Sequence, residues 1–335
     1  MDVSSSLWGS DLLFTDPKPI IDVHKGYIDA GADLVESSTY VTAPNGADDR
    51  YPLSVESILR EYPTKTPADA EDILHTGLSI LPSSSTSNQV LALGPYGATT
   101  KPGAEYSGLY PPPYGSGSVL DPSPSNHLSD SDDKSAEEAL YKFHLSRLQA
   151  YSRSSAWSEV EWIGFETIPL LREVRAIKRA MGDFGDEKKY WIACTFPDGQ
   201  CAESTKGGGR VGLDEVVRTL LSDEGRRPNG IGINCTNPAY IPTLINTFNT
   251  TLRSLQSKPE TWFVLYPDGG QVYDPISRTW SKEKLTPKEW TERIMTDVKS
   301  VDESGLWAGI IVGGCCKTSP EEIAELRKAV DHYLA

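Results

Sequence analysis

The chain contains no run of about 18 apolar residues, the length needed for a helix that crosses a membrane. Basic residues are also scarce: 32 Lys and Arg stand against 47 Asp and Glu, which gives a formal net charge of −15. Proteins that bind nucleic acid usually present a basic face, so this balance disfavours a nucleic-acid partner. The N-terminus lacks the basic and then apolar segments of a secretory signal, so we expect a cytoplasmic protein with no membrane partner.

Cysteine is sparse as well, and its number limits the chemistry. Five cysteines are an odd number in a chain of 335 residues, which is long enough to fold without disulfide bonds. A reducing compartment keeps thiols free, so metal binding or catalysis explains these cysteines better than disulfides do.

Short β-rich runs alternate with longer amphipathic stretches, a pattern typical of a parallel sheet covered by helices. Several of the runs are continuously apolar, as expected for strands buried on both faces. The predicted strands are Asp33–Ser37, Gln89–Leu93, Glu161–Phe165, Tyr190–Thr195, Gly230–Asn234, Trp262–Tyr266 and Ala308–Val312. The predicted helices are Pro19–Ala30, Val55–Leu81, Ala136–Ala156, Leu170–Met181, Leu213–Leu221, Ile241–Leu255, Pro287–Val301 and Pro320–Leu334.

Eight helices and seven strands are one strand short of a (β/α)8 barrel. We therefore predict a single α/β domain over residues 1–335, a TIM-type barrel that lacks its first strand. The run Leu12-Leu13-Phe14 is too weak to predict a barrel strand. Residues 99–133 form a Gly-, Pro-, Ser- and Tyr-rich loop insertion, which we expect to be a lid or a disordered segment.

Three cysteines follow the C-terminal ends of predicted strands. Cys235 comes directly after Gly230–Asn234, and Cys315 and Cys316 follow the last strand. Active sites of α/β barrels lie at this face and are built from residues at the ends of different strands. Three thiolates there match the protein ligands of a catalytic zinc, which leaves a fourth position open. We therefore predict a zinc site.

Cys315 and Cys316 are adjacent, and adjacent residues on a strand point to opposite faces. Both can reach one metal only if the chain turns, and the two glycines before them allow such a turn. Cys194 and Cys201 are interpreted as small core residues. No histidine follows a predicted strand, which disfavours a His-rich zinc site.

Polar residues also end other predicted strands at this face. Glu166 follows Glu161–Phe165, where its carboxylate can bind an ammonium or act as a base. The alternative is a helix N-terminal acid, because a helix begins soon afterwards. The first visible strand ends in four hydroxyl residues, Ser37, Ser38, Thr39 and Tyr40, which can bind a substrate carboxylate or serve as capping groups.

These motifs resemble those of the homocysteine S-methyltransferases, in order, from about residue 17 onwards. The matching segments are Ala30–Asp33, Ser38–Tyr40, Leu93–Gly97, Glu105–Gly108, Phe165–Pro169, Gly232–Cys235, Tyr266–Gly269 and Gly313–Cys316. Cys235 together with the Cys315–Cys316 pair is the specific part of the resemblance; the other segments alone are weak signals.

The resemblance implies a zinc barrel that transfers a methyl group to homocysteine and forms methionine. It implies that Cys235, Cys315 and Cys316 are the zinc ligands and that Glu166 holds the amino group of homocysteine. Members of the family take the methyl group from S-methylmethionine, S-adenosylmethionine, betaine or a folate. This chain looks most like the small members that use sulfonium donors, so we expect homocysteine and a sulfonium donor as its small-molecule partners.

Two features depart from the family pattern. The chain has no Asp-Gly-Gly-type motif of the first strand, and Asp268 stands where the family usually has Asn. The first departure supports a second hypothesis, a catalytically impaired or truncated zinc-binding barrel. A third hypothesis is a thiol-redox protein that uses the vicinal pair Cys315 and Cys316.

Overall fold

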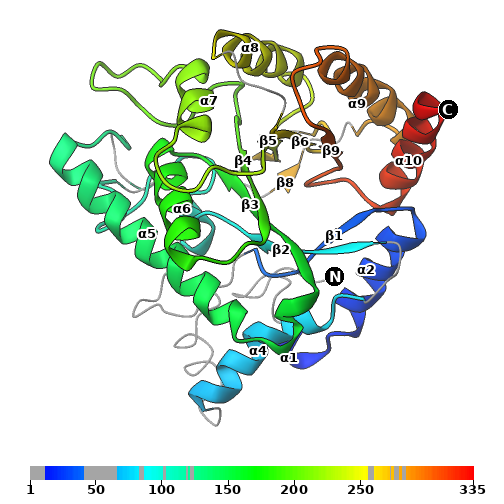
Figure 1. Cartoon of the computed structure of the whole chain (residues 1–335), viewed down its shortest axis with the longest axis horizontal. Helices are drawn as coiled ribbons and strands as arrows, with labels where there is room; N and C mark the ends of the chain where they lie inside the picture. The colour runs from blue at the N-terminus through cyan, green and yellow to red at the C-terminus, as the bar shows by residue number, and fades with distance from the viewer. Residues whose placement is uncertain are drawn as a thin grey trace.

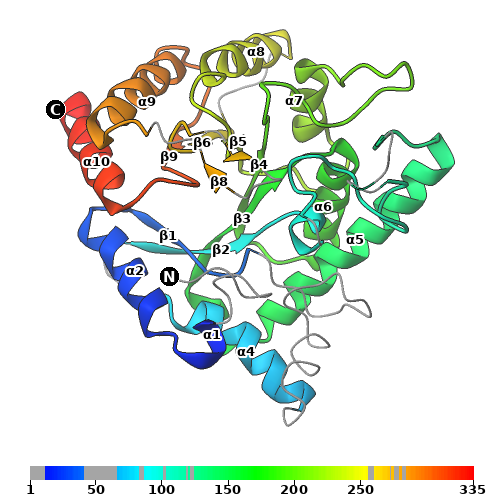
Figure 2. The same cartoon turned by 180° about the vertical axis from the view of Figure 1, so that it is seen from behind.

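The structure is a computed structural model that describes residues 12–40, 66–82, 87–100, 103–117, 120, 124–255, 260–271, 273–274, 279–280 and 284–335. Its centre is a parallel sheet in the order β1-β2-β3-β4-β5-β6-β9, curled inside a ring of helices (Figure 1, Figure 2). The strands are β1 Leu34–Glu36, β2 Asn88–Leu93, β3 Val160–Ile168, β4 Lys189–Cys194, β5 Gly230–Asn234, β6 Trp262–Tyr266 and β9 Ile310–Val312. Each lies where the sequence predicts a strand.

The long helices lie on the outside of the sheet. They are α2 Lys18–Asp29, α4 Pro67–Ser79, α5 Asp130–Ser152, α6 Leu171–Phe184, α7 Leu213–Leu221, α8 Ile241–Ser254, α9 Pro287–Asp302 and α10 Pro320–Leu334. Capping boxes at Thr66, Thr286 and Ser319, each followed by Pro, fix three of their starts. No helix in the described ranges is long and apolar enough to cross a membrane.

The differences from the predicted helices have local causes. Helix α5 begins six residues early because Ser129 caps its N-terminus, and acids in the first turn stabilise the helix dipole. Residues 55–65 of the predicted helix Val55–Leu81 lie outside the described residues. The run Leu12–Thr15 forms a short helix, α1, and the antiparallel pair β7 Tyr273–Asp274 and β8 Thr279–Trp280 was not predicted.

The sheet separates two apolar layers. The outer layer packs the strands against the helices, and the inner one fills the space inside the curl with residues that include Trp162, Trp191 and Val264. Close strand packing explains Gly232, since a Cβ there would lie 1.7 Å from the carbonyl oxygen of Val264. Side chains therefore fill the interior of the curled sheet, and an active site is expected at the carboxyl ends of the strands.

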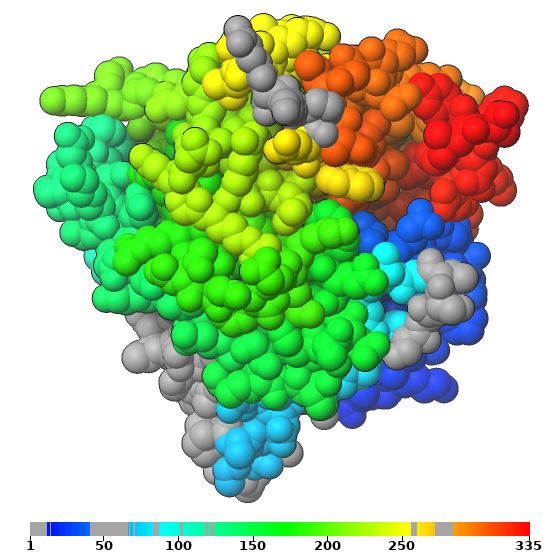
Figure 3. All heavy atoms as spheres, in the orientation of Figure 1, coloured from blue at the N-terminus to red at the C-terminus, as the bar shows by residue number. Residues whose placement is uncertain are grey.

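The sheet is open between β1 and β9, and within the described residues no strand fills this gap. The helix ring nevertheless continues across it, because α2 contacts α10 (Figure 3). Arg327 forms an ion pair with Asp33 at 2.8 Å, and the Tyr27 hydroxyl donates to the carbonyl of Thr318 at 3.4 Å. The architecture is thus a TIM-type α/β sheet with one strand fewer, as predicted.

The described part of the 99–133 insertion packs against α5 and α6. Tyr110 is fully buried, and its hydroxyl donates to Glu173 Oε2 at 2.6 Å. Glu173 also accepts from the backbone N–H of Tyr96 at 2.7 Å and lies 3.0 Å from His144 Nε2. These contacts anchor the segment that carries residues 105 and 106 to the carboxyl end of the sheet.

Candidate metal and substrate site

The three cysteines predicted as zinc ligands meet at the carboxyl end of the sheet. Their sulfur atoms all lie within 4.8 Å of one another. The Sγ atoms of Cys235 and Cys316 are 3.8 Å apart, and Cys235 and Cys315 are joined by a disulfide bond. Cys235 is buried, whereas Cys315 and Cys316 are half-buried. The structure thus brings together residues that are 80 and 81 positions apart.

The spacing of the sulfur atoms fits a tetrahedral metal. A Zn–S bond of about 2.3 Å in tetrahedral geometry places two sulfur atoms about 3.8 Å apart. Three thiolates form a set that zinc prefers, and they leave one position for a further ligand. Cys235 and Cys315 can act as such ligands only when their disulfide is reduced.

The turn after β9 carries both adjacent cysteines to this point. The backbone N–H of Cys315 donates to Pro267 at 2.8 Å, and the carbonyl of Cys316 accepts from Gly269 at 2.8 Å. We predicted that the conformational freedom of Gly313 and Gly314 allows this turn. In the structure the residue with a positive φ is instead Lys317, at 67°. Gly314 is required for space instead, because a Cβ there would lie 2.4 Å from Thr318 Oγ1.

Glu166 reaches the same region through a bulge in β3. The β3–β4 register shifts between Phe165 and Ile168, so Glu166 and Thr167 leave regular pairing. Asn234 holds the bulge: its Oδ1 accepts from the Thr167 N–H at 2.7 Å, and its Nδ2 donates to Thr167 Oγ1 at 2.8 Å. Because Asn234 precedes Cys235, one amide side chain couples the positions of the carboxylate and the thiol.

Backbone strain is concentrated at this site. Among the described residues, the non-glycine residues with positive φ are Thr167 at 61°, Cys235 at 43° and Lys317 at 67°. Each is a site residue or follows one directly in sequence. Such conformations cost about 1–3 kcal/mol each and persist mainly where function requires them.

Three carboxyl groups act on the thiol of Cys316, and a fourth, Glu36, acts on one of them, Glu166. The first three belong to Glu105, Glu166 and Asp268, and within the described residues none of the four forms an ion pair. Burial raises the pKa of Glu105, and it raises the pKa of Asp268 to about 6. Burial, with the Glu36 charge as a second cause, raises the pKa of Glu166 well above its usual range. The site therefore favours ligands that carry positive charge.

Tyrosines connect these groups. Trp191 Nε1 donates to the hydroxyl of Tyr266 at 3.1 Å, and Tyr266 is hydrogen-bonded to Glu166. Tyr106 is hydrogen-bonded to Cys316, and Tyr40 to Thr167. Of these residues only Tyr40 was predicted as a possible substrate contact; Tyr106, Tyr266 and Glu36 were not predicted as site residues. The available signal was their place in strand ends or in the Glu105–Gly108 motif.

The hydroxyl groups of Ser37 and Thr39 are hydrogen-bonded to the backbone of β2. Thr39 Oγ1 donates to the carbonyl of Ala92 at 2.7 Å and lies 2.5 Å from Ser37 Oγ, which in turn accepts from the Ala92 N–H at 3.0 Å. The methyl group of Thr39 packs against Gly77 of α4. These contacts give both residues a role in joining β2 to its surroundings and offer no support for the predicted substrate contacts.

The remaining cysteines are separate from the site chemistry. Cys194 and Cys201 are buried free thiols, and burial raises the pKa of Cys201 to about 12. Both therefore stay protonated at neutral pH, as expected for small core residues. The disulfide pairs Cys235 with Cys315, so the vicinal pair of the redox hypothesis is not the bonded one.

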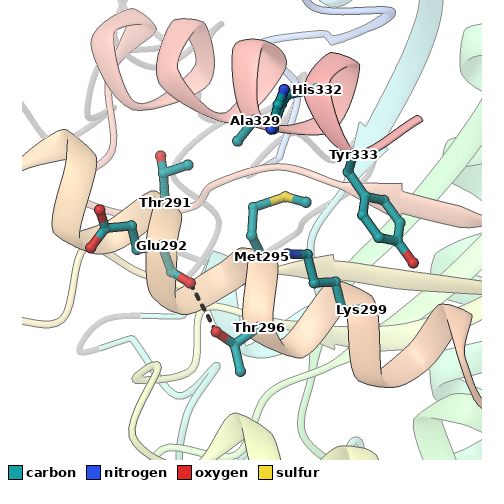
Figure 4. Close-up of a pocket in the computed structure, with 8 residues that line it drawn as sticks. All are labelled: Thr291, Glu292, Met295, Thr296, Lys299, Ala329, His332 and Tyr333. Carbon is teal, nitrogen blue, oxygen red and sulfur yellow. Dashed lines mark hydrogen bonds between the residues drawn. The ribbon is translucent and has the colours of Figure 1, made fainter. Parts of the chain in front are cut away.

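A hollow of about 410 Å³ lies away from the sheet, between α9 and α10 (Figure 4). Met295, Lys299, His332 and Tyr333 are among the residues that line it. It contains no thiol, and its carboxylate, Glu292, is exposed. This hollow belongs to the packing of the helix ring and not to the site.

Converging thiols and strained strand ends on a parallel curled sheet define an α/β-barrel enzyme with a cysteine-based active centre. The family model described as homocysteine S-methyltransferase matches residues 1–330, and the chain belongs to that family. The resemblance found in the sequence is therefore confirmed, and the protein is an enzyme, a homocysteine S-methyltransferase by family.

Known proteins similar to this chain carry the same designation. The homocysteine S-methyltransferase YbgG of Bacillus subtilis (strain 168) is 28% identical over 326 residues, 97% of this chain and 88% of that protein. The betaine-homocysteine S-methyltransferase of Drosophila melanogaster is 26% identical over 330 residues, 97% and 87% of the two chains. The metallated form of the Escherichia coli homocysteine methyltransferase MmuM has a similar fold, with a TM-score of 0.63, 20% identity and coverage of 98% and 90%.

Proposed function

We propose that this chain transfers a methyl group from a sulfonium donor, S-methylmethionine or S-adenosylmethionine, to the thiol of homocysteine, and that zinc held by Cys235, Cys315 and Cys316 supports the reaction. The approach of the three sulfur atoms to within 4.8 Å is the observation that carries this proposal. The absence of a cationic partner for the surrounding carboxyls, within the described residues, supports a positively charged donor.

Zinc, when bound, lowers the pKa of a thiol that enters its open position, so that homocysteine is a thiolate at neutral pH. The lone pair of that sulfur forms the new bond to the methyl carbon. The electrons of the broken S–CH3 bond return to the donor sulfur, which leaves as an uncharged thioether. The chain mainly has to align the two sulfur atoms with the carbon.

Glu166 is the group we assign to the amino group of homocysteine. Its carboxyl group lies at the end of β3 and acts on the thiol of Cys316, and an ammonium beside it would stabilise the ionised form that burial disfavours. Tyr266 and Trp191 fix its orientation through the hydrogen bonds described above. Because the ammonium of the acceptor is far from its reacting sulfur along the molecule, this contact serves positioning.

The alternative is a zinc-binding barrel of impaired activity. The gap between β1 and β9, within the described residues, favours it, because the family motif of the first strand is missing from this region. Such a protein would bind zinc through the same cysteines without turnover.

The test is to measure zinc content and methionine formation from homocysteine and S-methylmethionine, for the wild type, Cys316→Ser and the control Cys201→Ser. About one zinc per chain with turnover, both lost in Cys316→Ser and retained in Cys201→Ser, supports the proposal. Zinc without turnover with either sulfonium donor supports the impaired barrel. No zinc in reduced protein overturns both.

A further inference from the structure

We propose that Asp268 selects the methyl donor by charge: its carboxylate faces the positive sulfur of the donor and discriminates against uncharged molecules of the same shape. This inference rests on the proposed function and adds to it a residue that determines specificity. It concerns the donor side of the site, whereas Glu166 concerns the acceptor.

Asp268 is held rigidly beside the cysteine turn. Its backbone N–H donates to the carbonyl of Thr236 at 3.1 Å, and its carbonyl accepts from Trp290 Nε1 at 2.9 Å. Its Oδ1 accepts from the Gly270 N–H at 2.7 Å. The neighbouring residues on both sides are hydrogen-bonded to the Cys315–Cys316 turn. Backbone hydrogen bonds therefore fix the position of the residue, and the bond from the Gly270 N–H holds the carboxylate.

Asp268 forms no ion pair within the part of the chain that the structure describes. The Asp268 charge acts on Tyr106 and Cys316, and Glu105 acts on the same two groups. Glu105 Oε2 is a buried oxygen without a hydrogen-bond partner. Zinc would not neutralise this region, because a dication on three thiolates leaves one negative charge. A ligand that brings positive charge would offset this negative charge beside Cys316.

Asp268 and Glu166 both act on the thiol of Cys316, but their other partners differ. Glu166 interacts with Glu36 and is hydrogen-bonded to Tyr266. Asp268 acts on Tyr106 in addition to Cys316. The reaction has three cationic centres, because homocysteine carries an ammonium and the donor carries both an ammonium and a sulfonium. The sulfonium is the one that must lie in line with the acceptor sulfur at the thiols. Asp268 acts on the thiol of Cys316, so we assign the sulfonium to Asp268.

The reaction itself predicts how the contribution of Asp268 divides between binding and turnover. The positive charge of the donor sulfur disappears as its S–CH3 bond breaks. A fixed carboxylate therefore stabilises the bound donor at least as much as the transition state. Loss of this charge should raise the KM for the donor and leave kcat similar or slightly higher.

The experiment compares S-methylmethionine with homoleucine, its uncharged isostere in which a CH group replaces the sulfonium sulfur. Calorimetry on the zinc-loaded, homocysteine-saturated protein gives the dissociation constant of homoleucine, and KM with single-turnover rates gives that of S-methylmethionine. In the wild type we expect the sulfonium to bind at least about tenfold more tightly. In Asp268→Asn this ratio should fall towards one, with zinc content and homocysteine binding unchanged.

Asp297→Asn is the matched control, because Asp297 is a buried aspartate of α9 outside the site. It should keep the wild-type ratio. An unchanged ratio in Asp268→Asn, with turnover intact, overturns the inference and leaves the proposed function standing. If Asp268→Asn loses zinc or does not fold, the wild type alone tests the inference. Equal affinity of the wild type for S-methylmethionine and homoleucine would exclude selection of the donor by charge. Absence of wild-type turnover would instead contradict the proposed function.

Discussion

Cys235 Sγ lies 3.8 Å from Cys316 Sγ, although Cys235 is also bonded to Cys315. The same three sulfur atoms can therefore form a disulfide with one free thiol or a three-thiolate metal site. The two states are mutually exclusive, because a disulfide sulfur carries no negative charge for a metal.

The first prediction follows from this exclusion. Protein oxidised to the Cys235–Cys315 disulfide should bind almost no zinc, and reduction should restore about one zinc per chain together with activity. Bound zinc should in turn protect the three thiols from alkylation until a chelator is added. Mass spectrometry of alkylated peptides with metal analysis measures both effects. Equal zinc content in oxidised and reduced protein would show that other ligands hold the metal.

Glu166→Gln should weaken homocysteine binding. The amide keeps the shape of the side chain and removes the charge that pairs with the ammonium, so KM for homocysteine should rise about 10- to 100-fold. KM for the donor should change by less than about threefold, because the donor sulfonium is assigned to Asp268 and not to Glu166. Steady-state kinetics with each substrate varied separately checks this. A rise confined to the donor would reverse the two assignments.

Tyr266→Phe tests the positioning of Glu166. The substitution removes the hydroxyl that joins Trp191 to Glu166 and keeps the ring in the inner apolar layer. We expect a smaller rise of KM for homocysteine, about three- to tenfold. In the Glu166→Gln background the same substitution should have little further effect, because the two act through one contact. Additive effects in this double-mutant cycle would mean that Tyr266 acts independently.

The sequence predicted most of the fold because its signals are local. Continuous apolar runs located the seven strands, and a Thr or Ser followed by Pro located the starts of α9 and α10. The placement of Cys235, Cys315 and Cys316 after strands predicted that they converge, since all strands of a parallel barrel end at one face. These inferences need only periodicity, capping and strand direction.

The rest depended on contacts that sequence alone does not contain. Ser37 and Thr39 end a strand as a substrate contact would, but their hydroxyls are bonded to the β2 backbone. The Asn234 amide and the Tyr266 hydroxyl act across neighbouring strands, at distances that registers and bulges decide. The positive φ of Lys317, in place of a glycine, likewise reflects the hydrogen bonds of the cysteine turn.

Glu173→Gln should destabilise the protein without touching the thiols. Glu173 is fully buried, accepts from Tyr110 and the Tyr96 N–H, and is hydrogen-bonded to His144. In glutamine an NH2 group replaces one of the two carboxylate oxygens and would face the groups that donate to Glu173. We expect this change to lower the free energy of unfolding by about 2–4 kcal/mol. The expected signs are a lower Tm and faster proteolysis within 103–117. Glu161→Gln, at an exposed position of β3, should leave both unchanged, and equal behaviour of the two variants would contradict the anchoring role of Glu173.

Asp297→Asn should stabilise the protein in a pH-dependent way. Burial raises the pKa of Asp297 to about 6 from a usual 3.8, so the folded state holds its proton more tightly than the unfolded state does. Between these two pKa values the folded state binds more protons, and stability therefore falls as pH rises from about 4 to 6. Asparagine does not titrate and avoids this loss.

The free energy of unfolding of the variant should match that of the wild type near pH 4 and exceed it above pH 6 by about 1–3 kcal/mol. Thermal unfolding across pH 4–8 measures the difference. The control is Asp22→Asn, because Asp22 is an exposed aspartate of α2. A gain that is independent of pH would show that the buried charge is not its cause.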